Sequence, residues 1–172
     1  MFAKPLVERD SALQSLTRRR LPLWPGKKPS PQKIELIYFP YYLFKISVAI
    51  GGGKREICVA ADGLLGDLAL PEMGTLEFLE QADSPRFNFQ ISMEEAREKV
   101  LDECRWVLVK HGFHRRNLPR MEAVAGVRRF YYPYWVAYYR KRKGYDFRAV
   151  DGLSRAPIAI RTRRALLAAF AQ

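Results

Sequence analysis

The longest apolar stretches of the chain have the pattern of buried strands. They are residues 34–50, IELIYFPYYLFKISVAI, and residues 130–139, FYYPYWVAYY. The first is about as long as a short membrane span, but it contains Glu35, Pro40 and Lys45, which a lipid-spanning helix tolerates poorly. Turn-forming residues follow both stretches, at 51–53 and at 143–144. We therefore expect two long strands that each turn back into a hairpin, and no transmembrane segment.

The two stretches belong to an internal duplication. Residues 38–42, YFPYY, align with residues 131–135, YYPYW, and further along the Asp-Gly pair at 62–63 aligns with the pair at 151–152. The distance from the aligned proline to the aspartate is 22 residues in the first copy and 18 in the second. The difference fits in the hairpin tip, where insertions cost little free energy. Each copy is therefore predicted to contain a strand, a return strand and an Asp-Gly turn.

Helical patterns precede both copies. Residues 92–95, SMEE, have the sequence of a capping box, and apolar residues then recur at helical spacing as far as Gly112. A weaker helical pattern covers residues 5–20, where leucines share one face, and a proline-rich connector separates it from the first strand. A last basic segment, residues 160–171, also has a helical pattern.

These elements predict an α+β fold, made by tandem duplication of a helix followed by antiparallel strands and packed as one unit. The first repeat spans residues 1–88, and the second spans residues 89–172 with the basic C-terminal segment. The order of elements, the aromatic-proline-aromatic strand and the closing Asp-Gly turn resemble PepSY-type and other cystatin-like small α+β modules. Arg155 stands where Gly66 closes the first copy, so the two halves differ at this turn. Modules of this class are mostly binding or inhibitory domains without catalytic residues, and the resemblance implies the same here.

Both faces of the second long strand are aromatic, because alternate residues of a strand face opposite sides. One face can pack under the helix of its own half, and the other needs a second cover: the sister repeat, another subunit or a ligand. Core packing is the common role of such residues, so Trp135 is expected to be buried. The alternative is a platform for stacking nucleobases. Its candidate residues are Tyr134, Trp135, Tyr138 and Tyr139. Pro40 and Pro133 lack a backbone donor, so we expect each at a bulge or an edge position.

The net charge of +12 is unevenly distributed along the chain. Residues 1–55, 56–103 and 104–172 carry +8, −9 and +13. A basic surface indicates nucleic acid, anionic lipid or an acidic protein as partner, although the acidic middle could instead neutralise the basic ends within one fold. Arginine, which suits bidentate contacts with phosphate, provides 20 of the 30 cations. The candidate residues for binding nucleic acid or another anion are Arg115, Arg116, Arg128, Arg129, Arg140, Lys141, Arg142 and Lys143.

The chain contains no convincing catalytic or metal-binding motif. A glycine run at 51–53 precedes a lysine, but a phosphate-binding loop also needs a serine or threonine next and then a helix. Cys104 and His111 lie two helical turns apart, too far to bind one metal ion. Asp62 and Asp151 fit the ordinary chemistry of Asp-Gly turns. We therefore expect no enzyme activity, no cofactor and no metal.

The sequence favours a non-catalytic basic binding or assembly module for an anionic partner, with nucleic acid as that partner. The first alternative is an adaptor or subunit of a protein complex, which would bind an acidic protein or form an oligomer. A third is an enzyme with a pocket between the repeats. The N-terminus, MFAKPLVERDS, has charges where a signal peptide needs an apolar run, so we expect a cytoplasmic protein.

Overall fold

The computed structural model of the chain describes residues 1–17, 30–50, 53–69, 76–112, 120–142 and 144–170. The helices in these ranges are α1 (Arg9–Thr17), α2 (Met93–Gly112) and α3 (Ile160–Phe170). The strands are β1 (Phe2–Ala3), β2 (Lys33–Ile50), β3 (Gly53–Asp62), β4 (Leu68–Ala69), β5 (Phe78–Leu79), β6 (Arg120–Lys141) and β7 (Gly144–Asp151). No helix in the described part of the chain is long and apolar enough to cross a membrane.

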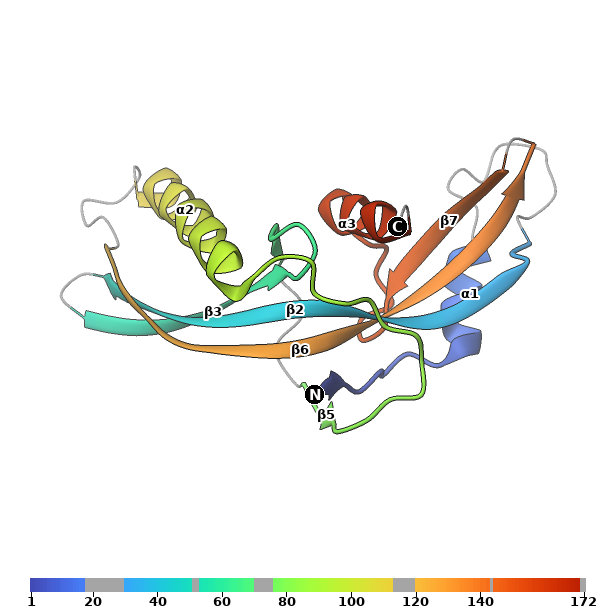
Figure 1. Cartoon of the computed structure of the whole chain (residues 1–172), viewed down its shortest axis with the longest axis horizontal. Helices are drawn as coiled ribbons and strands as arrows, with labels where there is room; N and C mark the ends of the chain where they lie inside the picture. Colours follow the sequence, from blue (N-terminus) through green and yellow to red (C-terminus); the bar gives the residue numbers. More distant parts are fainter. Residues whose placement is uncertain (18–29, 51–52, 70–75, 113–119, 143, 171–172) are drawn as a thin grey trace.

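Two long antiparallel strands, β2 and β6, form the centre of one mostly antiparallel sheet (Figure 1). They pair from Lys33 opposite Tyr138 to Ala49 opposite Arg120. The β2–β3 hairpin extends the sheet at one end and the β6–β7 hairpin at the other, while β4 adds to the outer edge of β3. β1 runs parallel to the middle of β6 and pairs with β5. The predicted α+β fold, packed as one unit, is confirmed.

The internal duplication is visible in the strand register. Phe39 of β2 pairs directly with Tyr132 of β6, and these are the residues that the duplication places in equivalent positions. Antiparallel strands that pair equivalent residues are related by a local twofold axis at that pair. The return strands keep the relation, because β3 pairs with β2 and β7 pairs with β6 through matching ends of the two copies. The axis therefore passes through the centre of the sheet.

Pro40 and Pro133 lie where the return strands leave the sheet. The Gly63 amide donates to the Pro40 carbonyl at 2.7 Å, and the Gly152 amide donates to the Pro133 carbonyl at 3.0 Å. The nitrogen and the carbonyl of one strand residue point to the same side. Each proline nitrogen therefore faces the strand edge beyond the end of the return strand, where no donor is needed. The edge position is therefore the correct alternative, and the register shifts between β2 and β6 lie elsewhere.

The two Asp-Gly turns are closed in the same way. Asp62 accepts backbone amides of its turn at 2.6–3.0 Å, and Asp151 does so at 2.8 and 2.9 Å. Gly66 and Arg155 follow at equivalent positions with φ of +75° and +63°. The turn thus needs a left-handed residue in both copies, and Arg155 adopts the conformation that glycine takes more readily.

Each N-terminal helix packs on the hairpin of the other repeat. Leu16 of α1 shares a buried cluster with Ala137 and Tyr139 of β6. Val100 of α2 shares another with Phe44 of β2. The expectation that one aromatic face of β6 packs under the helix of its own half is therefore wrong, because the helix on that face is α1 of the first repeat.

The segments that lead into the helices explain this exchange. The Tyr131 amide of β6 donates to the Met1 carbonyl at 3.0 Å, and the Tyr38 amide of β2 donates to the Pro85 carbonyl at 2.8 Å. Each lead segment is thus held by the long strand of the sister repeat, and the helix that follows a few residues later lies over the sister hairpin. Strand alternation places α1 and α2 on one face of the sheet, and in Figure 1 they lie at its two opposite ends.

The capping box predicted before the long helix is confirmed. The Ser92 amide donates to Glu95 Oε2 at 2.9 Å, and the Glu95 amide donates to Ser92 Oγ at 3.1 Å. The first helix is shorter than predicted, because α1 begins at Arg9 and leaves Leu6 outside it and exposed. Only its residues Ala12 and Leu16 are buried.

The opposite face of the β6–β7 hairpin is covered by α3. Phe170 of α3 contacts the rings of Tyr138 and Phe147, with centroid distances of 5.8 and 5.2 Å. Tyr138 and Phe147 pair across the second hairpin as Lys45 and Cys58 pair across the first, and the latter two are exposed. A helix on the first hairpin would have to bury the lysine, which is unfavourable. The second cover expected for the aromatic strand is therefore α3, on the second repeat alone.

Candidate nucleic-acid interface

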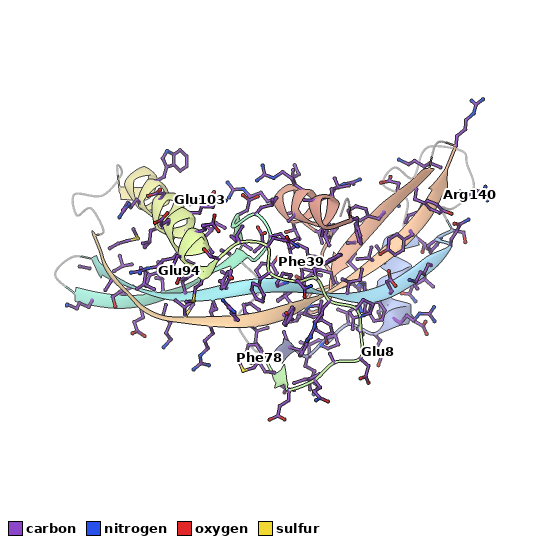
Figure 2. The ribbon with its side chains drawn as sticks, viewed as in Figure 1. Glu8, Phe39, Phe78, Glu94, Glu103 and Arg140 are labelled. Carbon is purple, nitrogen blue, oxygen red and sulfur yellow. The ribbon has the colours of Figure 1, made fainter. Side chains whose placement is uncertain are left out.

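The β6–β7 hairpin ends in a projecting basic tip. Its exposed cations are Arg140, Lys141 and Arg142. Figure 2 shows Arg140 at the far end of this hairpin, away from the core residue Phe39. Three of the predicted anion-binding residues are thus close together. The predicted residues Lys143, Arg115 and Arg116 lie outside the described side chains.

One cation of the tip is neutralised within the hairpin. Lys141 Nζ lies 2.6 Å from Asp146 Oδ2, and this hydrogen bond lowers the pKa of the Asp146 carboxyl below its ordinary value. Arg140 and Arg142 have no ion-pair partner among the described residues. Their guanidinium groups each offer five N–H donors in a planar fork that matches phosphate oxygens. The anion-binding capacity of the tip therefore lies mainly in these two arginines.

Tyr145 adds an exposed ring beside these arginines. It pairs with Arg140 across the hairpin and is 71% exposed. Directly paired residues of antiparallel strands lie on the same face, with Cβ atoms about 4.5–5.5 Å apart. Tyr145 is not among the residues predicted for stacking, which all precede the turn. Its position opposite Arg140 in a tight hairpin is the sequence signal that could have found it.

The first hairpin shows that the fold does not require an arginine opposite an aromatic ring near the tip. Ser47 pairs with Glu56 there, at the positions equivalent to Arg140 and Tyr145. A valine and an alanine follow Ser47, where the second hairpin continues with lysine and arginine. The two hairpins have the same pairing, although the first carries its exposed cations, Lys54 and Arg55, on the return strand and has no aromatic ring at its tip. The pair of Arg140 and Tyr145 is therefore not needed for the hairpin to form and is available for binding.

Arg128 and Arg129 do not join the tip. They are neighbours in β6 and so point to opposite faces of the sheet. The Arg129 guanidinium lies over the rings of Tyr42 and Phe89, 5.6 and 5.4 Å from their centroids. This cation–π packing gives Arg129 a structural role. Arg128 is exposed on the other face.

Tyr134 and Tyr139 are core residues rather than stacking residues. They are 5% and 8% exposed. The Tyr134 hydroxyl hydrogen-bonds to the Tyr41 hydroxyl, and the Tyr139 hydroxyl donates to the Leu16 carbonyl at 2.8 Å. Burial raises the pKa of both phenols. Neither ring offers a face to solvent, which corrects their prediction as a stacking surface.

Trp135 and Tyr138 are half-buried and held in place by other parts of the chain. Trp135 Nε1 donates to the Val7 carbonyl at 2.8 Å, which ties the N-terminal segment to β6. Trp135 is expected from the sequence to be buried, and the structure shows it partly buried, packed against the cluster around Leu16 and Ala137. Tyr138 packs against Phe170 of α3, and burial raises the pKa of its hydroxyl. The aromatic stripe thus binds α1 and α3 to the sheet.

The arginines of α3 are engaged in ion pairs with three other elements. The pairs are Arg161–Glu103 at 2.8 Å, Arg163–Asp146 at 3.0 Å, and Arg164–Asp67. They connect α3 to α2, to β7 and to the turn after β3. Exposed ion pairs contribute little stability individually, but three of them fix how the helix lies. These cations are therefore structural, whereas Arg140 and Arg142 of the tip have no such pairs among the described residues.

Of the two residues considered for metal binding, Cys104 has a described side chain and His111 does not. No group of three or more histidine, cysteine, aspartate and glutamate side chains in the described ranges is close enough to bind an ion. Cys104 belongs to α2, where its side chain is buried against the sheet, and burial raises the pKa of its thiol. Its chemistry is that of a core residue.

Comparison with known proteins gives no relative. No family model matches the chain, and no curated protein or solved structure is similar to it. The resemblance to PepSY-type and cystatin-like modules therefore stays a prediction from the sequence pattern. What can be inferred about function comes from the tip and from its contrast with the first hairpin.

Proposed function

We propose that this protein is a non-catalytic module that binds single-stranded nucleic acid with the tip of its β6–β7 hairpin. One observation carries the proposal. Arg140 and the exposed Tyr145 occupy a projecting end of the sheet where the equivalent hairpin has Ser47 and Glu56. The fold forms with either set, so the basic and aromatic set is explained by binding rather than by folding.

In the proposed complex the arginines bind phosphates and the tyrosine ring stacks on a base. Arg140 and Arg142 bind phosphate oxygens, and the net charge of +12 attracts polyanions from a distance. Tyr145 stacks on a base, which a single strand presents freely and a duplex does not. An acidic protein would satisfy the same arginines. The exposed ring beside them favours nucleic acid, because every unpaired base offers a π face.

The salt dependence of binding tests the proposal. Each phosphate contact on a single strand contributes about 0.7 to the slope of log affinity against log salt. Replacing two contacting arginines, Arg140→Ser with Arg142→Ser, should therefore flatten the slope for a short homopolymer oligonucleotide by about 1.4. The melting temperature should not change, because both side chains are exposed. The matched control, Lys54→Ser with Arg55→Ser, removes the same charge from the first hairpin and should leave the slope nearly unchanged.

Two results would reject the proposal. If the wild type shows no binding to single-stranded oligonucleotides near ~50 mM salt, nucleic acid is not the partner, and an acidic protein becomes the better candidate. If the tip variant and the control variant weaken binding equally, the effect comes from net charge and the tip is not the site.

A further inference from the structure

A pocket of about 450 Å³ lies between the two repeats, on the side of the sheet covered by α3. Small-molecule sites usually measure about 300–1,000 Å³ and are common where two structural units meet. Leu68 and Ala69 of β4 form one wall, and Pro157 and Ile158 form the other. Tyr134 lines the same pocket. The first turn of α3 borders it through Thr162.

The duplication itself creates this pocket. Leu68 of β4 pairs with Ala61 of β3, and Pro157 pairs with Val150 of β7. These two pairs occupy equivalent positions in the two repeats. The two walls are therefore formed by equivalent segments, one from each repeat, and the pocket lies near the twofold axis. The proposed hairpin tip is at the end of the sheet, so this site is distinct from the proposed interface.

The two repeats do not contribute the same chemistry. Asp62 of the first repeat is 4% exposed, and its two oxygens accept three backbone amides. Its equivalent, Asp151, is partly exposed and lines the pocket. Tyr132 donates to Asp151 Oδ2 at 2.9 Å, whereas its equivalent in the first repeat, Phe39, has no hydroxyl. The polar wall of the pocket thus belongs to the second repeat.

Asp151 has acceptor capacity left for a ligand. Its Oδ1 accepts the Leu153 and Ser154 amides at 2.8 and 2.9 Å, and its Oδ2 accepts the Tyr132 hydroxyl. A carboxylate offers about four acceptor positions, so one on Oδ2 remains beside these described partners. The cation among these lining residues, Arg161, is neutralised by Glu103 at 2.8 Å. The charge of the pocket therefore favours a donor over an anion.

We propose that the inter-repeat pocket binds a small molecule that has an apolar body and a protonated amine. The apolar body lies between Leu68 and Ile158, and the amine donates to Asp151 Oδ2. Thr162 and Ser154, both in the lining, provide hydroxyl groups for a second polar contact. Such an ion pair is charge-assisted and partly shielded from water, so it discriminates strongly between an amine and a carboxylate.

Phenethylamine and its carboxylate counterpart, 3-phenylpropionate, test the inference by NMR titration of the full chain. Phenethylamine should shift the amide signals of Leu68, Ser154 and Ile158 with a saturable, millimolar dissociation constant. 3-Phenylpropionate should bind at least ~10-fold more weakly. Failure of phenethylamine to give saturable shifts, or equal binding of the carboxylate, overturns the assignment.

Two variants locate the binding in the pocket. Ala159 is exposed and lines the pocket, so Ala159→Trp should fill it and abolish the shifts. The matched control, Ala123→Trp, places the same side chain at an exposed position of β6 and should retain them. Asp151→Asn keeps a turn-forming side chain but removes the charge, and should weaken the binding of phenethylamine by at least ~10-fold. Unchanged binding in both pocket variants would refute the site, whatever the oligonucleotide experiments show.

Discussion

The hydroxyl groups of Tyr41 and Tyr134 hydrogen-bond to each other at 2.8 Å. The two residues are 93 positions apart and equivalent in the duplication, so each repeat gives the same side chain to one shared bond. They are 1% and 5% exposed, and burial raises the pKa of both phenols. The contact is a self-complementary polar bond between the two repeats, buried beside the inter-repeat pocket.

Removing one of these hydroxyls should lower the free energy of unfolding by more than half of the loss caused by removing both. Tyr41→Phe or Tyr134→Phe alone leaves a buried hydroxyl without its partner, which destabilises by about 1–3 kcal/mol. The double variant leaves an apolar pair of similar shape, so its loss should be smaller than the sum of the single losses. Urea unfolding of the four proteins measures this. Additive losses would show that the two hydroxyls are not coupled.

The exchange of helices predicts how the chain behaves when it is cut. Separating residues 1–88 from 89–172 removes α2 from Phe44 and α1 from Tyr139. At least one fragment alone should be insoluble or lack fixed tertiary packing, whereas the two expressed together should associate into one native-like complex. Near-ultraviolet circular dichroism and gel filtration report these states. Two well-folded fragments that do not associate would contradict the shared core.

The helix exchange was beyond the reach of the sequence for a definite physical reason. The duplication could be read from the aligned prolines and Asp-Gly pairs, because turns and strand periodicity are local properties. Which hairpin a helix covers depends instead on single backbone bonds, such as the Tyr131 amide to the Met1 carbonyl, which leave no side-chain pattern. Trp135 illustrates the same limit. The sequence predicts a buried ring, whereas the structure shows it partly buried, with Nε1 donating to the Val7 carbonyl of the N-terminal segment.

The basic tip was partly predictable. Arg140, Lys141 and Arg142 form a run that local sequence reveals directly, and the structure places them together. Tyr134 and Tyr139 could not be separated from exposed rings, because alternation makes both faces of β6 aromatic and only the tertiary positions of α1 and α3 decide which are covered. The contact residues of a sheet therefore depend on its covering helices more than on the strand sequence.

The left-handed position of the Asp-Gly turn gives a matched pair of stability predictions. Arg155 has φ of +63°, where a side chain costs about 1–2 kcal/mol, so Arg155→Gly should stabilise by roughly 0.5–1 kcal/mol after the added chain entropy. Gly66→Ala should destabilise by more than ~1 kcal/mol, since its φ is +75° and a Cβ would lie 2.8 Å from Ile91 Cδ1 and Lys99 Cδ. Thermal unfolding measures both. Loss of stability in Arg155→Gly would show that the arginine side chain contributes to the turn.

The ring of Tyr145 should matter for binding and not for folding. Because Tyr145 is 71% exposed, its ring makes few buried contacts, so Tyr145→Ser should leave the melting temperature nearly unchanged. If a base stacks on the ring, this substitution should cost about 1–3 kcal/mol of binding free energy to a single-stranded oligonucleotide. Because no phosphate contact is removed, the salt slope should stay the same, in contrast to the arginine variants.

Tyr145→Trp supplies the control, because a larger ring at the same place should keep or improve affinity. The comparison also separates the ring from the charge of its neighbour Arg140, which neither substitution alters. Fluorescence anisotropy at several salt concentrations gives affinity and slope together. If Tyr145→Ser binds as tightly as the wild type while the arginine variant does not, the tip holds the strand through phosphates alone. Binding would then be expected to tolerate duplex as well as single strands, since both present the same phosphates to Arg140 and Arg142.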